Sequence, residues 1–545
     1  MKNHGFKLEA RSVSFALPDG RKILEKVSFL ADGPSIALIG RNGSGKTTLL
    51  RILAGELAPS GGSVGARGRV VYLPQKIERA GGRLVRDLLG ISDVLKALER
   101  IEAGDAPPEV IEEVEWKWDT RARCSGLLRK VGLERLSLDA PLLSLSGGEL
   151  LRLAFCAAML KEPDILLLDE PTNNLDRKSR LKLLAFLASW KGIKIIATHD
   201  RQLLESLDSV AEIYDGKFTL YRMRYPEYVA YRRAMNEAAE LKAAETRKHL
   251  AKDRKQLGAV MDRRLHHTAS AERRVRKDEG VCRLNLSSAR SKGQATTAGI
   301  REIHLKRIEA AKKEFLEAKA RVRPENRIEI DVPQDPMPAG KRIFALEDVN
   351  VFYGGAPLWK RPVSFQLSGN TRMALIGPNG SGKTTILRLL SGKLRPASGT
   401  VSVPASPVVY LDQFLEYLDP ERTILENVWS RGAGMSESLV RTRLARLFFR
   451  RDAVHKKVAC LSGGEKLRVA LAKLFCAGKP PQLLLLDEPT NNMDLDSCEQ
   501  LESALAGFKG AMLAVSHDYR FLNAIGAEDF FDLSPYCEAE RRYEL

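Results

Sequence analysis

The chain has 545 residues, of which 44% are apolar and 29% charged, and a formal net charge of +18. A single hydrophobic core does not extend over such a length, so several domains are expected. No run of eighteen apolar residues occurs, which argues against a membrane-spanning helix. The seven cysteines are scattered without a close CxxC pair, and the first residues show no apolar signal core. A cytoplasmic protein with reduced thiols is the simplest expectation.

The first elements in the chain predict a phosphate-binding loop. Residues 6–30 alternate apolar and polar side chains around a turn at Pro18-Asp19-Gly20, which predicts antiparallel strands. The buried-strand pattern Ser35 to Ile39 then leads into a GxxxxGK[ST] motif and an apolar helix, Leu49 to Leu53. In such a loop backbone N–H groups surround phosphate oxygens, the lysine reaches the β- and γ-phosphates, and the following hydroxyl coordinates Mg²⁺. The motif and its flanks are Gly40, Arg41, Asn42, Gly43, Ser44, Gly45, Lys46, Thr47 and Thr48.

The whole set of landmarks occurs twice, in the same order. The second phosphate loop is Gly377, Pro378, Asn379, Gly380, Ser381, Gly382, Lys383, Thr384 and Thr385. Further pairs are Tyr72-Leu73-Pro74-Gln75 with Tyr410-Leu411-Asp412-Gln413, Leu145-Ser146-Gly147-Gly148-Glu149 with Leu461-Ser462-Gly463-Gly464-Glu465, and Ala197-Thr198-His199-Asp200 with Val515-Ser516-His517-Asp518. This long period indicates duplicated domains rather than a short-repeat solenoid.

The offset between the copies changes between the glutamine and the LSGGE stretch. It falls from 338 to 316 residues, so the first copy carries about twenty extra residues there, around 90–125. That material includes Gly104-Asp105-Ala106-Pro107-Pro108 and a helical pattern from Glu109 to Lys117. We expect a surface arm that could make an additional contact.

Two carboxylates follow a buried strand in each copy. Asp169 and Glu170 come after Ile165 to Leu168, at the carboxyl end expected beside the phosphate loop. The aspartate is predicted to hold Mg²⁺ and the glutamate to orient or deprotonate the attacking water. Asp487 and Glu488 are predicted to do the same in the second copy.

Phosphate loop, glutamine, LSGGE, Asp-Glu and histidine together resemble the nucleotide-binding domain of ABC ATPases, in both copies. The resemblance implies two domains paired head-to-tail within one monomeric chain around two ATP molecules. Site one would combine the first phosphate loop, Gln75, Asp169, Glu170 and His199 with Ser462, Gly463 and Gly464. Site two would combine the second loop, Gln413, Asp487, Glu488 and His517 with Ser146, Gly147 and Gly148. The implied Mg²⁺ ligands are Thr47, Gln75, Asp169, Thr384, Gln413 and Asp487.

The two copies differ where the resemblance places an aromatic residue against adenine. Tyr353 fits in the second copy, whereas the same register in the first copy gives Leu17, which covers the base by apolar contact alone. Both glutamates and both histidines are present, so both sites are predicted to hydrolyse ATP. Whether they turn over equally stays open.

The segment between the copies holds most of the excess charge. Residues 222–323 contain 27 Lys and Arg against 13 Asp and Glu, a net +14. The pattern predicts a helix from Tyr228 to Glu279 and a second from Ile300 to Val322, folded as an antiparallel hairpin with its tip at Gly280 to Gly299. Its one-signed charge disfavours a plain coiled-coil spacer and favours RNA phosphates as the partner.

Two domains of this kind, a charged helical linker and the stretches Pro-Thr-Asn-Asn-Leu-Asp and Pro-Thr-Asn-Asn-Met-Asp resemble the ABC-F class. Asp176 and Asp494, which end these stretches, would lie at the domain–domain seam. The expected domains are 1–221, a linker 222–335 and 336–545, with an α/β fold of two P-loop ABC-type ATPase domains joined by a helical hairpin. The resemblance implies an ATP-dependent translation factor that binds the ribosome, close to rRNA and tRNA, and leaves it after hydrolysis.

Alternatives remain at this point. An ATPase subunit that drives a separate membrane transporter would share both domains, but would leave the linker without a function. A DNA-repair type of ABC ATPase is disfavoured because zinc cysteine pairs and a very long coiled-coil insertion are missing from the sequence. Within the ribosome hypothesis, a housekeeping factor and a ribosome-protecting antibiotic-resistance factor are not separated; the deciding residues would lie at the tip, Val281 to Ala298.

Overall fold

The computed structural model describes most of the chain as two compact units. The larger unit is formed by Met1–Tyr225 and Asn326–Leu545, and the smaller one is Pro226–Glu325. The described residues are 5–77, 82–103, 107, 119–173, 175–275, 302–319, 338, 340–403, 407–412, 417–429, 435–476, 481–491 and 493–537. The expected domain limits at 221, 222, 335 and 336 remain predictions, since this division groups the two ATPase copies together.

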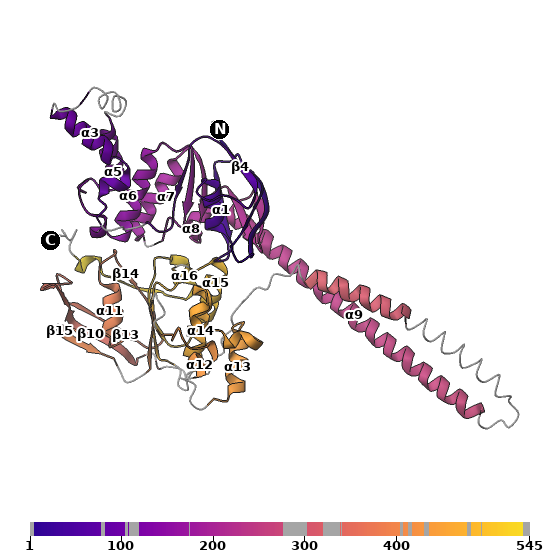
Figure 1. Cartoon of the computed structure of the whole chain (residues 1–545). Helices are drawn as coiled ribbons and strands as arrows, with labels where there is room; N and C mark the ends of the chain where they lie inside the picture. The colour runs from indigo at the N-terminus through magenta and orange to yellow at the C-terminus, as the bar shows by residue number, and fades with distance from the viewer. Residues whose placement is uncertain are drawn as a thin grey trace. The chain divides into compact units, whose positions relative to one another are not determined.

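The first copy is built on a mostly parallel sheet (Figure 1). Its strands lie in the order β5 (Val70–Leu73), β6 (Ile165–Asp169), β7 (Ile193–Ala197), β3 (Ser35–Gly40), β8 (Ser209–Tyr214) and β9 (Lys217–Tyr221). Only β9 pairs antiparallel, with β8. A separate antiparallel sheet joins β2 (Lys22–Ala31), β1 (Lys7–Ala16) and β4 (Gly61–Arg67), as the alternating pattern predicts.

The helices described in the first copy begin at the end of the phosphate loop and follow it in sequence. They are α1 (Lys46–Leu53), α2 (Val85–Leu89), α3 (Ser92–Glu102), α5 (Thr120–Lys130), α6 (Gly147–Leu160), α7 (Arg177–Ser189) and α8 (Arg201–Glu205). The predicted helical stretch Glu109 to Lys117 lies outside the described residues. The part of the expected arm that is described is α3 and α5, and Leu95 and Cys124 anchor it in a small apolar core with α6.

The second copy repeats this plan. Its parallel sheet has the order β16 (Val408–Leu411), β17 (Leu483–Asp487), β18 (Ala511–Val515), β14 (Arg372–Ile376) and β19 (Asp529–Asp532). An antiparallel sheet joins β13 (Val363–Ser368), β10 (Arg342–Asn350) and β15 (Ser398–Ser402), and β11 (Phe352–Tyr353) pairs with β12 (Ala356–Pro357). Its helices are α11 (Lys383–Leu390), α12 (Ile424–Trp429), α13 (Glu437–Arg446), α14 (Gly463–Phe475), α15 (Leu495–Ala506) and α16 (Tyr519–Ala524).

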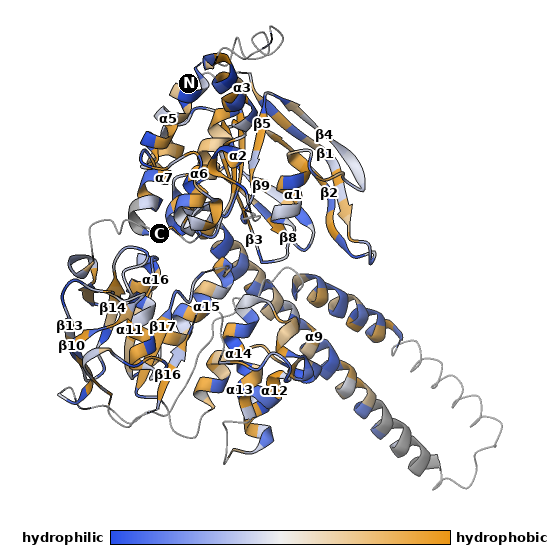
Figure 2. Cartoon of the chain, turned by 60° about the vertical axis from the view of Figure 1, so that its left-hand side comes forward, coloured by the Kyte–Doolittle hydropathy of each residue, from blue (hydrophilic) through white to orange (hydrophobic). Residues whose placement is uncertain are grey.

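The buried strands explain why both phosphate loops are held firmly. Every residue of β6 and of β17 is buried, as expected for parallel strands covered on both faces. Figure 2 shows β17 as a hydrophobic segment inside the second copy. Leu49 and Leu50 of α1 pack into the same core as β3 and β6, and Ile386 and Leu387 of α11 do so in the second copy. The loop between strand and helix is therefore anchored at both ends.

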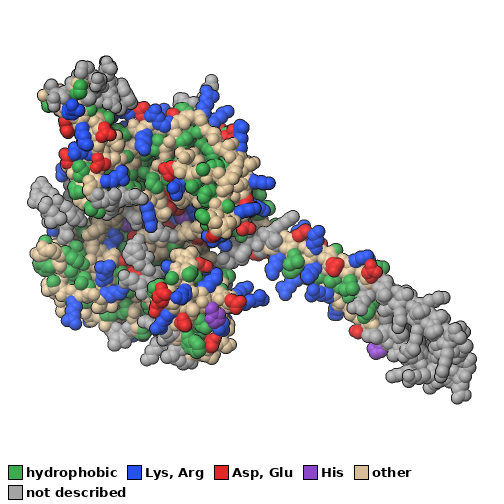
Figure 3. Space-filling view, in the orientation of Figure 1, with side chains coloured by type: hydrophobic (Ala, Val, Ile, Leu, Met, Phe, Trp, Pro, Cys, Tyr) green, Lys and Arg blue, Asp and Glu red, His purple; other side chains and the backbone are tan. Residues whose placement is uncertain are grey.

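The smaller unit is a helical hairpin. Helix α9 (Tyr225–Val275) has 51 residues, close to the predicted length, and the helical residues 302–319 run alongside it in Figures 1 and 2. Leu250 and Ala318 are buried within this unit, which gives the pair an apolar seam. Lys and Arg side chains are spread along its described surface in Figure 3. The tip, Val281 to Ala298, lies outside the described residues. None of the helices in the described ranges is long and apolar enough to cross a membrane.

Candidate nucleotide sites

Each phosphate loop is closed by its own lysine. Nζ of Lys46 donates to the carbonyl oxygens of Gly40 at 2.7 Å and Arg41 at 3.2 Å, and Nζ of Lys383 makes the matching contacts at 2.8 and 3.0 Å. Burial lowers the pKa of both lysines, while the nearby glutamate opposes that shift. The ammonium group is thus placed where triphosphate oxygens can replace the loop carbonyls.

Glycine before each lysine is required by space as well as by backbone conformation. Gly45 has φ +100°, and a Cβ there would lie 2.6 Å from Cγ2 of Ile23. In the second copy Gly382 has φ +89°, and its Cβ would lie 2.7 Å from a methyl carbon of Leu358. Ile23 and Leu358 therefore pack directly on the phosphate loops of their copies. Any residue larger than glycine would displace the loop.

An oxygen-rich cluster lies beside each lysine. Thr47 Oγ1 donates to Asp169 Oδ2 at 2.7 Å, and the Tyr72 hydroxyl is 3.4 Å from the same oxygen. In the second copy Tyr410 donates to Asp487 Oδ2 at 2.9 Å. Burial raises the pKa of both aspartates, and the hydroxyl donors oppose it. Hydroxyl and carboxylate oxygens in this arrangement fit the ligand preference of Mg²⁺.

The glutamate of each site is buried and faces the histidine. Glu170 Oε2 accepts from the His199 backbone N–H at 3.3 Å, and its Oε1 is 3.4 Å from His199 Nε2. Glu488 and His517 repeat these contacts at 3.4 Å each. Burial raises the pKa of both glutamates to about 8 and lowers that of His199 to about 3 and His517 to about 4. Both histidines are therefore neutral at physiological pH.

The glutamates have a strained backbone, and side-chain atoms of the glutamates and of His199 lack hydrogen bonds. Glu170 has φ 49° and Glu488 φ 47°, a left-handed conformation that costs free energy in a non-glycine residue. Oε1 of each glutamate and both ring nitrogens of His199 are buried without a hydrogen-bond partner among the described residues. A buried polar atom without a partner requires an explanation. An attacking water and the terminal phosphate of a nucleotide would satisfy these atoms.

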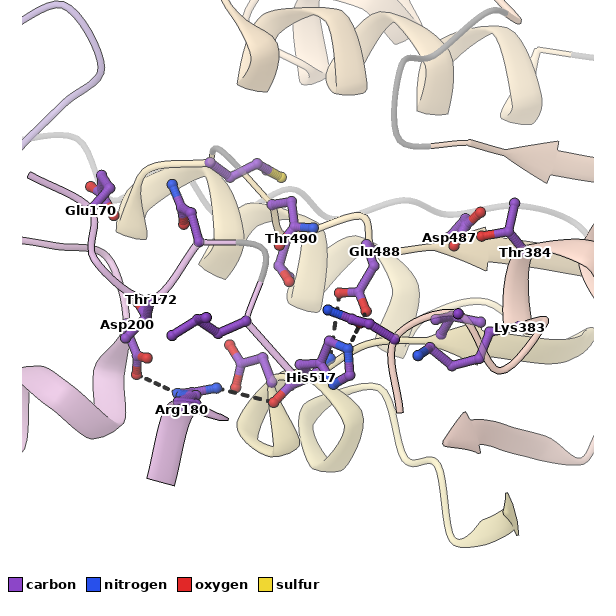
Figure 4. Close-up of a pocket in the computed structure, with 18 of the residues that line it drawn as sticks. Glu170, Thr172, Arg180, Asp200, Lys383, Thr384, Asp487, Glu488, Thr490 and His517 are labelled. Atoms are coloured by element: carbon purple, nitrogen blue, oxygen red, sulfur yellow. Dashed lines mark hydrogen bonds and ion pairs between the residues drawn. The ribbon is translucent and has the colours of Figure 1, made fainter. Parts of the chain in front are cut away.

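Two cavities gather most of the predicted residues. The first, of about 610 Å³, is lined by Leu17, Asn42, Gly43, Gly45, Lys46, Thr47, Thr48, Gln75, Asp169, Glu170 and His199, together with Arg21, Ile23, Lys76 and Asn173. The second, of about 510 Å³, is lined by Tyr353, Asn379, Gly380, Gly382, Lys383, Thr384, Thr385, Asp487, Glu488 and His517, and also by residues of the first copy such as Glu170 and Arg180 (Figure 4). Gln413 lies outside the described residues.

Comparison with known proteins identifies this architecture. A family model described as "ABC transporter" matches residues 24–173 and 361–491, which is more than half of the chain. The "Energy-dependent translational throttle protein EttA" of Escherichia coli (strain K12) is 30% identical over 94% of this chain and 90% of its own. The "Tylosin resistance ATP-binding protein TlrC" of Streptomyces fradiae is 32% identical over 92% and 93%. This chain belongs to the ABC family, in the ABC-F group.

The fold comparison agrees with that assignment. A solved structure titled "RNase-L Inhibitor" superposes with a TM-score of 0.55 at 19% identity, covering 96% of this chain and 87% of its own. At that identity the likeness concerns the fold alone. The predicted α/β class with tandem ATPase domains is thereby confirmed, and the chain is an ATPase of the ABC-F group.

Contacts between the two ATPase copies also place the seam aspartates. The backbone N–H of Asn42 donates to Asp494 Oδ2 at 3.1 Å, and Arg41 Nε is 3.0 Å from Asp496 Oδ2. The first phosphate loop thus contacts the start of α15 in the second copy. Asp176, the counterpart of Asp494, lies near His517; burial raises the pKa of its carboxyl, but the hydrogen bonds from Ser179 outweigh burial and leave the pKa lowered.

The signature loops take the expected local form, and they do not line either of the two cavities. Ser146 and Ser462 cap α6 and α14, each accepting from the backbone N–H of the glutamate three residues on. Among the described residues that line the two cavities, no signature serine or glycine occurs: Ser146, Gly147, Gly148, Ser462, Gly463 and Gly464 lie elsewhere. Their contact with nucleotide across the seam therefore stays a prediction.

Sequence reasoning missed four residues that contact the sites. Tyr72 and Tyr410 are repeat landmarks in the sequence, but no pattern there predicts the contact of their hydroxyl groups with the aspartates. Trp359 donates from Nε1 to the carbonyl oxygen of Ser381 in the second phosphate loop, at 2.8 Å. Arg180, in α7, contacts the second copy. The recurrence of Tyr-Leu next to the glutamine is the one signal in the sequence that could have indicated the tyrosines.

Proposed function

We propose that both sites bind ATP with Mg²⁺ and hydrolyse it. Lys46 and Lys383 hold the β- and γ-phosphates after leaving the loop carbonyls. Thr47 and Asp169, and Thr384 and Asp487, are the proposed metal ligands, with Gln75 and Gln413 beside them. When bound, Mg²⁺ neutralises charge on the transferring phosphoryl group.

The glutamates supply the catalytic base in this proposal. Glu170 and Glu488 orient the attacking water and, in their ionised form, accept its proton, since their buried Oε1 atoms have no partner among the described residues. The neutral histidines can each present a ring N–H to a terminal phosphate oxygen. The carboxylate oxygen and the imidazole nitrogen are only 3.4 Å apart, so water and phosphate would contact both groups from the cavity side rather than lie between them.

We infer that the partner is the ribosome. The observation that carries this is the basic helical hairpin between two complete ATPase copies, which bears most of the chain's excess charge. RNA presents a dense phosphate surface that such a hairpin fits. The names of two relatives, a translational throttle protein and a tylosin resistance protein, point to the same machinery. The chain would act in the cytoplasm as a monomer, with rRNA and tRNA as contacts of the hairpin.

A trapping experiment tests the proposal. The double variant Glu170→Gln, Glu488→Gln keeps the shape of both sites but removes the base, so it should bind ATP and stay on ribosomes. The variant should co-sediment with ribosomes in the presence of ATP but not in the presence of ADP. Glu56→Gln, an exposed carboxylate 49% accessible in the same copy, is the matched control. Recovery in the membrane fraction, with ribosomes free of the protein, would instead support a transporter subunit.

Charge reversal tests the hairpin separately. Lys248, Lys252 and Lys255 are exposed on α9 and fall near one face at helical spacing. Changing all three to Glu should weaken ribosome binding and lessen its dependence on salt concentration. The control reverses three exposed lysines of the first copy, Lys22, Lys130 and Lys191. Equal loss in both triple variants would argue for non-specific attraction.

The choice between a housekeeping and a protective factor needs a growth assay. Expression in a susceptible bacterium, followed by growth across ribosome-directed antibiotics, distinguishes them. Protection against a drug class that disappears in the Glu170→Gln, Glu488→Gln variant would establish the resistance function. Unchanged sensitivity to every drug would favour a general translation factor.

A further inference from the structure

One arginine side chain of the first copy reaches the histidine loop of the second. Arg180 lies in the first turn of α7, and its side chain is 14% exposed. Its Nη1 donates to the backbone carbonyl of His517 at 3.1 Å, and its Nη2 pairs with the Asp200 carboxylate. Figure 4 shows the guanidinium between these two partners.

Both partners belong to the loops that carry the site histidines, His199 and His517, which are called the histidine loops. His517 is the histidine that faces Glu488, and Asp200 directly follows His199. Asp200 is itself fixed, because its carboxylate accepts from the backbone N–H groups of Gln202 and Leu203 at the start of α8, at 2.9 and 3.1 Å. A single guanidinium thus joins the loops that carry the histidines of the two ATP sites.

The repeat does not provide this bridge a second time. The offset of 318 residues that relates His199 to His517 relates Arg180 to Cys498 and Asp200 to Asp518. Cys498 lies in α15 and is buried, and burial raises the pKa of its thiol, so it carries no charge. A neutral cysteine side chain is too short to connect two loops as an arginine fork does.

We propose that Arg180 is a positioning residue for the second site, where it holds the His517 loop in place when the two copies are together and ties it to the His199 loop. At the first site Cys498 stands at the matching position, and the His199 loop is tied to α15 of the second copy by a different pair, Arg201 with Glu502 at 2.7 Å. The proposal rests on the roles assigned above to Glu488 and His517. Hydrolysis at the second site therefore depends on Arg180 more strongly than hydrolysis at the first site, because Asp200 keeps its backbone donors and Arg201 keeps Glu502 when Arg180 is replaced.

The test separates the two sites in the full-length protein. Arg180→Cys, which copies the residue of the second repeat, is combined with Glu170→Gln to leave only site two active, or with Glu488→Gln to leave only site one. In the first combination kcat should fall about tenfold with little change in KM, as expected for one lost charge-assisted hydrogen bond. In the second it should change by less than about twofold. Arg180→Lys should recover part of the loss, because it keeps the charge without the fork.

Controls exclude a general loosening of the fold. Lys182→Cys removes an exposed cation from the same helix and should leave both activities unchanged. Equal slowing of both sites by Arg180→Cys, or no slowing of site two, would overturn the proposal; a drop in melting temperature of the variant with equal slowing would assign Arg180 a purely structural part. If Glu488→Gln alone failed to reduce hydrolysis, the catalytic assignment would be wrong instead.

Discussion

The buried tryptophan behind the second phosphate loop allows a quantitative prediction. Trp359 is fully buried, and Nε1 donates to the Ser381 carbonyl at 2.8 Å. Its own backbone is held by Asn350, whose side-chain amide donates to the Trp359 carbonyl at 2.7 Å. A Cβ on Gly382 would meet the indole ring at 2.8 Å, so ring and loop are in contact. Trp359→Phe removes the donor and keeps an aromatic ring in the same pocket.

The expected loss follows from that geometry. Leaving the Ser381 carbonyl without its donor should cost about 1–3 kcal/mol. Trp359→Leu, which leaves a cavity as well, should cost about 3–5 kcal/mol. Trp429→Phe is the matched control, because that ring is 42% exposed and should change stability by less than about 0.5 kcal/mol.

Hydrogen exchange of the α11 amides, followed in the full-length protein, measures this local loss of stability. Protection factors in Lys383–Leu390 should fall by about tenfold for each 1.4 kcal/mol lost, while those of α1 (Lys46–Leu53) should not change. Unchanged α11 exchange in Trp359→Phe would refute the claim that the indole braces this loop. An equal fall in α1 would show that the effect is not confined to the second copy.

Three further outcomes are expected. Leu17→Tyr should tighten ATP binding by several-fold at the first site, and Tyr353→Leu should weaken it similarly at the second, as equilibrium titration with the other site disabled would show. The folded, nucleotide-free protein should lose stability as pH rises from about 6.5 to about 8. Burial raises the pKa of Glu170 and Glu488 to about 8, whereas the unfolded chain releases those protons at lower pH. Below about 6.5 the two histidines oppose this loss, because burial lowers their pKa from 6.5. Urea titrations of the double Gln variant should not show that loss. Lys46→Ala should abolish ATP binding at the first site alone, measured by the same titration.

Much of each site could be predicted because its residues are close in sequence. The run from Gly40 to Thr48 forces a strand, a loop and a helix in succession, and the loop binds phosphate through its own backbone. Glu170 follows a wholly buried strand, so its position at the carboxyl end of the sheet follows from parallel pairing alone. No local sequence pattern predicts its left-handed backbone or its contact with His199.

Contacts between distant residues could not be predicted in the same way. Trp359 and Ser381 are 22 residues apart, and Arg180 and His517 are 337 apart, so no periodicity relates them. From the sequence alone, a tryptophan is predicted to be an ordinary core residue, and an arginine at the start of a helix is predicted to be a solvated charge. Only the fold shows that the Arg180 side chain is mostly buried between the two histidine loops.

The duplicated copies have diverged where they meet, rather than where they catalyse. Both keep a buried glutamate with a neutral histidine 3.4 Å away. Around that common core, Arg41 pairs with Asp496 across the seam, whereas proline stands at the matching position of the second loop, Pro378. The Arg180 bridge also occurs on one side only. Each ATP site is therefore connected to the opposite copy by different side chains, so domain closure is expected to act on the two glutamates unequally.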